Sequence, residues 1–317
     1  MKKLLIVILF LLNSSLIFSQ SATDYGIISF KEKLILRAAI NTQNESFTII
    51  ENSEKFNVEA SNLFKLQLAA NYKFIGLAIG FSPKNRNSDF NSTFLQSNLQ
   101  FFIKKQWIQS FHYSRIKGYY LETQPQDLDK QFPNLKTISI TGTTAYNYNP
   151  KFSLKHLLHH NAWQQESAGS IIPSLTYGLN KIIDIADNEK VVQNNLDIAL
   201  ATSYYYTWCF KRNWFISPNI SPIIGLRFFT EKNKATDNKT REIHLIRGLN
   251  LGLQYGYTSH KISTGVKFNF DSNWVNNEST REFTNDKDYV NLYFAYRIEP
   301  PGFLKRGVDN INEKLKF

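Results

Sequence analysis

Residues 62–81 read NLFKLQLAANYKFIGLAIGF, and the spacing of their apolar side chains decides the fold. In the first half these side chains fall on even positions, and in the second half they fall on odd positions. Because successive strand residues point to opposite faces, each half predicts a strand with one apolar face. A tight turn between Lys73 and Phe74 explains the change of phase. It places on one side the cross-strand pairs Leu66 and Phe81, Leu68 and Ile79, and Ala70 and Leu77.

The opposite face of this hairpin is polar or small, with Lys65, Gln67, Asn71 and two glycines. A strand of about ten residues crosses a bilayer when it is tilted. Strands with an apolar face toward lipid and a polar face toward the lumen are typical of an outer-membrane β-barrel.

The same alternation recurs along the chain as far as Ile298. We predict an all-β fold, a single transmembrane antiparallel β-barrel of about 12 strands (range about 10–14) with short periplasmic turns and long extracellular loops. Short turns are expected near residues 73, 105, 149, 212 and 260. Long polar connections are expected at 41–61, 117–136, 179–193, 230–241 and 271–287. Between the turns at 149 and 212 the sequence offers three strand candidates where two are needed. Of these, 152–163 is expected to span and 167–177 to fold into a loop or the lumen.

The two ends of the chain differ from this pattern. Residues 1–19 have a basic start, a short apolar core and a small-residue exit, which predicts a cleaved signal peptide and export to the bacterial outer membrane. The barrel is expected over 20–298. Residues 299–317 are expected to form a loosely attached periplasmic tail, or a short helix with Val308, Ile311 and Leu315 on one face.

The composition excludes some kinds of bond and binding site and favours others. Cys209 is the only cysteine, so an intrachain disulfide and a thiolate metal cluster are excluded. The net charge of +11 is scattered over an exported chain, which argues against nucleic acid and favours contact with anionic lipid or solutes. The sequence predicts no cofactor and no metal site.

Several short stretches carry a family resemblance: YSRIKGYY at 113–120, YNYN at 146–149, QQESAGS at 164–170 and YRI at 296–298 before Pro300. The chain resembles an uncharacterised barrel family of Gram-negative bacteria, the domain of unknown function numbered 4421. The resemblance covers most of the mature chain. That family has no established activity, so the resemblance implies a fold and supplies no catalytic residues.

Strand parity points a set of charges into the lumen, namely Arg37, Lys65, Asp197, Arg227, Lys267 and Arg297. They either fill the lumen as partners of loops and water, or line a basic passage that favours small anionic solutes. About 12 strands leave a narrow lumen, which favours the first interpretation.

Two groups of residues suggest chemistry. His112 and Ser114 have the His-x-Ser spacing of outer-membrane phospholipases, in which the pair must face lipid. Here the neighbouring aromatic residues occupy the lipid face, which argues against that arrangement. A phospholipase-like enzyme that modifies lipid is therefore the alternative hypothesis, and a non-enzymatic barrel is the first. His156, His159 and His160 form a cluster with no nearby carboxylate, which favours structural histidines over metal ligands.

Arg115 and Arg247 fall on the apolar face by parity, each near the expected long-loop end of its strand. They are candidates for contact with outer-membrane lipid and with the phosphates of lipopolysaccharide, or they extend their charged ends into water. The sequence therefore predicts a non-enzymatic outer-membrane barrel, a narrow channel or an envelope structural component. A further alternative is a barrel that binds a partner or assembles into a complex through its loops.

Overall fold

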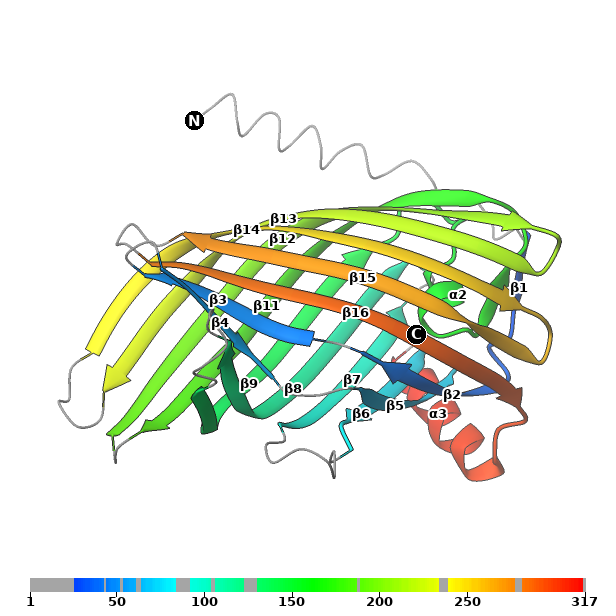
Figure 1. The fold of residues 1–317 in the computed structure, drawn as a ribbon. Helices are drawn as coiled ribbons and strands as arrows, with labels where there is room; N and C mark the ends of the chain where they lie inside the picture. The colour runs from blue at the N-terminus through cyan, green and yellow to red at the C-terminus, as the bar shows by residue number, and fades with distance from the viewer. Residues whose placement is uncertain are drawn as a thin grey trace.

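The computed structural model describes residues 26–42, 44–51, 54–60, 64–83, 92–103, 106–122, 130–186, 189–233, 239–276 and 281–315 (Figure 1). The predicted signal peptide lies outside these residues. The sheet strands are β2 (Leu34–Asn41), β3 (Asn44–Glu51), β4 (Glu54–Glu59), β5 (Lys65–Tyr72), β6 (Ile75–Phe81), β7 (Thr93–Ile103), β8 (Trp107–Glu122), β9 (Lys130–Tyr146), β11 (Ala168–Ala186), β12 (Glu189–Phe210), β13 (Trp214–Asn233), β14 (Lys239–Thr258), β15 (Ile262–Asn276) and β16 (Arg281–Ile298).

These strands form one antiparallel sheet that closes on itself as a barrel. The sheet contains 14 strands, and closure runs through the pairings β15–β16 and β7–β8. The β3–β4 hairpin continues β2 and β5 toward the long-loop end, where β4 pairs directly with β8. Without that extension, 12 strands close the barrel at the short-turn end. The predicted all-β barrel of about 12 strands is confirmed.

The hairpin formed by β5 and β6 has the predicted register. Leu66 lies opposite Phe81, Leu68 opposite Ile79 and Ala70 opposite Leu77. Leu68 is 57% exposed on the outer wall, whereas Lys65 is 1% exposed on the lumen side. The outward apolar residues of the whole barrel form a continuous belt, called here the apolar band, which includes Leu36, Leu68, Leu77, Ile79, Phe111, Ile140, Leu179, Leu200, Ile224, Leu251, Phe268 and Phe294.

Several predicted loops are strands instead. The longest strand, β12, has 22 residues, which is about 70 Å of extended chain and about twice the height of the apolar band after tilting. The barrel wall therefore continues well beyond the band at the long-loop end. Outside lipid a strand needs no apolar face, so the described residues of 41–61, 179–193 and 271–287 lie mostly in strands, and the prediction of loops there is wrong.

The C-terminal segment is a helix, α3 (Gly302–Leu315), and it is docked against the barrel. Val308 is 6% exposed and packs on Leu34, Tyr72 and Phe74 at the short-turn end. Lys73 forms an ion pair of 2.5 Å with Asp309. The prediction of a loosely attached tail is wrong, because one helix face covers outward side chains of β2 and β5. Neither described helix is long and apolar enough to span a membrane.

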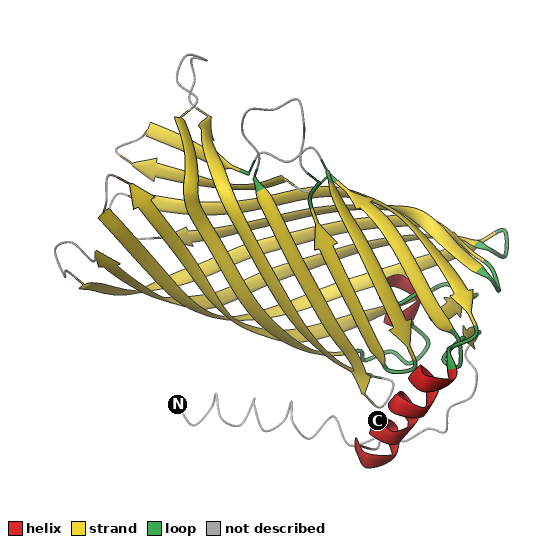
Figure 2. Cartoon of the chain, turned by 90° about the horizontal axis from the view of Figure 1, so that it is seen from below, coloured by secondary structure: helices red, strands yellow, loops and turns green. Residues whose placement is uncertain are grey.

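The remaining elements lie inside the barrel at the same end (Figure 2). They are β1 (Ile27–Ser29), α2 (Leu154–Leu158) and β10 (Ala162–Gln164). The chain does turn at residues 149–152, where the N–H of Phe152 donates to the carbonyl oxygen of Asn149 at 3.0 Å. This turn leads into the lumen and does not join two wall strands, and 152–163 is not a wall strand. Residues 167–177, expected in the lumen or a loop, lie almost entirely in β11 instead. The wall strand and the internal segment are therefore the reverse of the prediction.

Candidate functional site: a plug across the lumen

Residues 147–167, called here the plug, leave the end of β9, cross the lumen and return to the start of β11. Residues 26–30, called here the N-terminal lead, are part of the same layer, because β1 pairs with β10 from Ile27–Gln164 to Ser29–Ala162. Ser153 caps α2, and its Oγ accepts the N–H of His156 at 3.2 Å. Two segments far apart in the sequence thus form a single internal layer.

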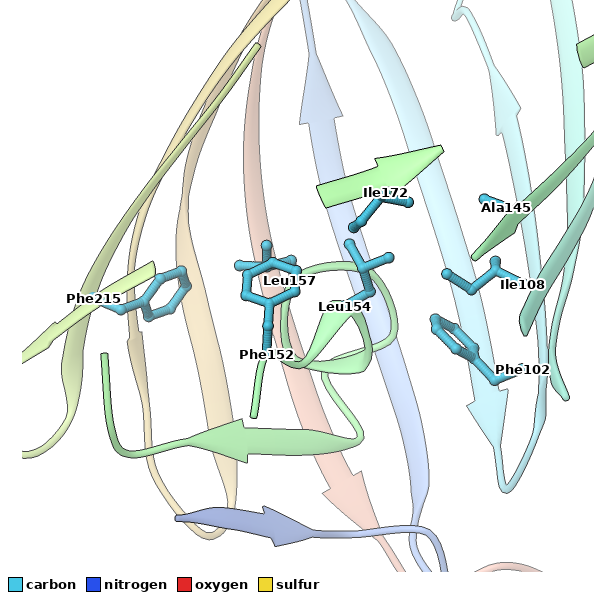
Figure 3. Packing of buried hydrophobic residues seen from close by; sticks show 8 residues of the cluster. All are labelled: Phe102, Ile108, Ala145, Phe152, Leu154, Leu157, Ile172 and Phe215. Carbon is cyan, nitrogen blue, oxygen red and sulfur yellow. The ribbon is translucent and has the colours of Figure 1, made fainter. Parts of the chain in front are cut away.

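An apolar cluster joins the plug to the wall (Figure 3). The plug contributes Phe152, Leu154 and Leu157, each less than 9% exposed. The wall contributes Phe102, Ile108, Ala145, Ile172 and Phe215 from five strands. A buried apolar side chain of this size contributes about 1.5–3 kcal/mol, so the cluster holds the plug in place.

Arg297 is the main polar anchor. Its Nη2 and Nε donate to the carbonyl oxygen of His160 at 2.7 and 3.1 Å. Its Nη1 donates to the carbonyl oxygens of Ser259 and Ile262 at 2.7 and 3.0 Å. The guanidinium also lies 4.2 Å from the ring centroid of Phe30 in the N-terminal lead. One side chain of β16 therefore ties together a wall turn, the plug and the lead.

Asparagine amides supply further anchors between the plug and the wall. Asn71 donates to the carbonyl oxygen of His159 at 3.1 Å, and Asn161 donates to that of Lys73 at 3.0 Å. Sequence reasoning missed these residues, because an asparagine on a lumen face has no distinctive spacing.

The three histidines of the predicted cluster lie in the plug, but they do not share a strand face. Their rings contact different wall aromatics: His156 lies 4.3 Å from Phe215, His159 4.7 Å from Phe102 and His160 4.5 Å from Tyr293 between ring centroids. His160 has a φ of 56°, a left-handed conformation that is unusual outside glycine. The described residues contain no group of three or more His, Cys, Asp or Glu side chains placed to hold a metal ion.

Burial keeps these imidazoles neutral. Desolvation lowers the pKa of His156 to about 4 and that of His159 to about 3. It also lowers the pKa of His160 well below its ordinary value, and Arg37 acts in the same direction. The Nε2 atoms of all three rings are buried without a hydrogen-bond partner among the described residues. A proton added to any of them has no acceptor in the plug layer.

Gly76 makes room for the plug in the wall. A Cβ atom at this position would lie 2.3 Å from Asn71 Oδ1 and 2.4 Å from His159 Nε2. At Gly80, on the same strand and the same face, the three atoms nearest to a Cβ would all belong to the side chain of Gln96, the nearest at 2.6 Å. The absence of a side chain at Gly76 therefore leaves the space that the ring of His159 occupies.

All six predicted charges project from the lumen face, but they do not form one cluster. Arg227 makes a two-point ion pair with Asp197, with both distances 2.8 Å. Lys65 lies 3.8 Å from the ring centroid of Phe94, and Arg37 donates to Gln67 at 2.8 Å. Arg297 belongs to the plug anchor. Lys267 lies beside Tyr289.

The remaining candidate residues lie on the barrel wall, two on the lumen face and two on the outer face. His112 and Ser114 share the lumen face with buried Ile116, whereas Phe111 is exposed on the outer wall. That is the opposite face from the one the phospholipase hypothesis requires. Arg115 and Arg247 are exposed on the outer face, as parity predicts. Neither arginine is near the long-loop end of its strand, because β8 continues to Glu122 and β14 continues to Lys239.

The family described as "Domain of unknown function (DUF4421)" matches residues 23–298. No curated protein matches. The outer membrane protease OmpT from Escherichia coli is similar in structure, with 4% identity, a TM-score of 0.43 and coverage of 86% of this chain and 98% of that one. The COG4313 outer membrane channel from Pseudomonas putida F1 has 10% identity, a TM-score of 0.41 and coverage of 88% and 100%. The transport unit of the autotransporter AIDA-I from Escherichia coli has 12% identity, a TM-score of 0.45 and coverage of 89% and 94%.

Proposed function

Since the chain belongs to the family of unknown function that matches residues 23–298, we propose a function from the lumen itself: a narrow outer-membrane passage that favours small anionic solutes and is closed by the plug. The short turns and the plug face the periplasm, and the long-loop end faces outward. The observation that carries the proposal is the plug, an internal segment seated on the wall mainly by side chains.

The lumen beyond the plug suits water and anions. Buried polar atoms of the wall, including Arg37 Nε, Asn98 Oδ1 and Asn195 Oδ1, have no hydrogen-bond partner among the described residues. Such atoms favour bound water, because a buried polar group without a hydrogen bond is energetically unfavourable. Arg37 and Lys267 add positive charge on neighbouring faces of this space, while Asp197 is neutralised by Arg227.

The test is single-channel conductance in planar bilayers at neutral pH. The wild-type protein is expected to pass little steady current. Gly76→Ala is expected to raise the open probability, because the new Cβ displaces His159 from its seat. Gly80→Ala is the matched control, since it lies on the same face of β6 but away from the plug, and it is expected to behave like wild type.

Selectivity tests the second half of the proposal. In a salt gradient the reversal potential of Gly76→Ala is expected to indicate preference for chloride over potassium. Adding Lys267→Gln to that variant is expected to reduce the preference. An open variant that prefers cations would overturn the anionic passage, and a Gly76→Ala barrel that folds but stays silent would overturn the passage altogether.

A further inference from the structure

A patch of positive charge lies on the outer wall of β8, β9 and β11, at the edge of the apolar band that is nearer the long-loop end. The strand register places Lys117 directly opposite Lys136. The next rung toward the band contains Arg115, Ile138 and Lys181. The rung below that is apolar and consists of Tyr113, Ile140 and Leu179.

The four charges of this patch are close together. Neighbouring strands are about 4.8 Å apart and alternate residues of one strand about 7 Å apart, so the backbone positions farthest apart, those of Lys117 and Lys181, are about 12 Å apart. Like charges directly opposite each other destabilise a strand pair. Within the described part of the chain, Arg115, Lys117 and Lys181 form no ion pair with a carboxylate. The outward carboxylate of Glu59 accepts the hydroxyl of Tyr120 at 3.0 Å.

The height of the patch matches the outer membrane–water interface. Trp107 begins β8 at the short-turn end and packs on Tyr146, with 4.9 Å between ring centroids. Arg115 is eight residues and Lys117 ten residues farther along. At about 3.3 Å per residue and a tilt of about 40°, they lie about 20 and 25 Å above Trp107. The apolar band of such barrels is about 25 Å tall.

We propose that Arg115, Lys117, Lys136 and Lys181 form a binding site for the phosphate groups of lipopolysaccharide in the outer leaflet. The guanidinium of Arg115 offers two-point hydrogen bonds to a phosphate, and the ammonium groups add point charges around it. The acyl chains of the same molecule lie against the apolar rung of Tyr113, Ile140 and Leu179. This site concerns the outer wall and stands apart from the proposed passage.

Arg247 provides the contrast. It is a single exposed cation whose cross-strand neighbours are Ile224 and Trp274. The next two outward pairs of β13 and β14 toward the long-loop end are apolar, Leu226 with Leu245 and Phe228 with Ile243. With no second cation beside it, Arg247 lacks the charge density that a phosphate group requires. The long side chain of Arg247 instead extends its charged end to the membrane–water interface.

The experiment measures binding of purified lipid A to the detergent-solubilised full-length protein. Wild type is expected to bind bisphosphorylated lipid A at least tenfold more tightly than lipid A stripped of its phosphates. The triple variant Arg115→Gln, Lys117→Gln, Lys181→Gln is expected to lose that difference. Arg247→Gln is the matched control and is expected to keep it.

Two results would overturn the proposal: no discrimination by wild type, or full discrimination by the triple variant. Equal affinity for phosphatidylglycerol micelles would also overturn it, by showing a general preference for anionic lipid. If the triple variant does not fold, the single variants Arg115→Gln and Lys181→Gln serve instead. Each is then expected to weaken binding to bisphosphorylated lipid A several-fold without changing binding to the stripped lipid.

Discussion

Acidification is expected to open the passage, and the plug histidines determine by how much. The pKa of His156 is lowered from 6.5 to about 4 and that of His159 to about 3 while the plug is seated. A displaced plug exposes both rings to water and restores their ordinary pKa. Protonation therefore favours the displaced state. The closed state has its full stability above about pH 6.5 and loses it as the pH falls toward the lowered pKa values.

The size of the effect follows from the linkage. At pH 5 each ring is about 1.5 pH units below its ordinary pKa, which costs the closed state about 2 kcal/mol per ring. The two rings together shift the equilibrium by about 4 kcal/mol, or about a thousandfold. His160 acts in the same direction. Lys155, Arg37 and Arg297 face these rings, so no neighbouring negative charge offsets the new cations.

The assay is the open probability of single channels at pH 7 and pH 5. Wild type is expected to open far more often at the lower pH. The double variant His156→Gln, His159→Gln is expected to lose most of this response. His244→Gln, at a histidine that pairs with Glu242 at 3.1 Å on β14, is expected to keep it. A flat response in wild type, or an unchanged response in the double variant, would refute the linkage argument.

Three further outcomes are expected. Val308→Asp should release α3 and speed its cleavage by protease, since it places a charge among Leu34, Tyr72 and Phe74, whereas Phe303→Asp at a 74% exposed position should not. Arg297→Ala should lower the unfolding free energy by at least about 3 kcal/mol, because several charged hydrogen bonds are lost, and an unchanged unfolding temperature in detergent would contradict this. Ser114→Ala should leave both conductance and any lipid hydrolysis by the purified protein unchanged, and a hydrolytic activity that disappears in this variant would favour the enzyme alternative.

The lipid-facing part of the fold could be predicted from the sequence because lipid imposes a strict rule. Every second side chain of the hairpin at 65–81 must be apolar, and a slip of one residue would bury Leu68 and expose Lys65. Beyond the bilayer that rule lapses. Segments such as 179–193 then lose the strict alternation and look largely polar, although their described residues continue β11 and β12.

The plug could not be predicted from alternation, because its apolar residues fit two periods. Residues 152–163 read FSLKHLLHHNAW, in which alternate positions suggest a strand. Leu154, Leu157 and Leu158 also have helical spacing after the capping residue Ser153, and this is the signal that identifies α2. The partners in the wall, such as Gly76, become recognisable only when the barrel brings them to the plug.

The most direct test of the closed lumen is nuclear Overhauser spectroscopy of the full-length protein in detergent micelles at neutral pH. The account predicts contacts from the imidazole protons of His159 to the ring of Phe102 and to the α-protons of Gly76. Contacts of His159 confined to residues 152–163, with its ring open to water, would show that the lumen is not closed by this segment.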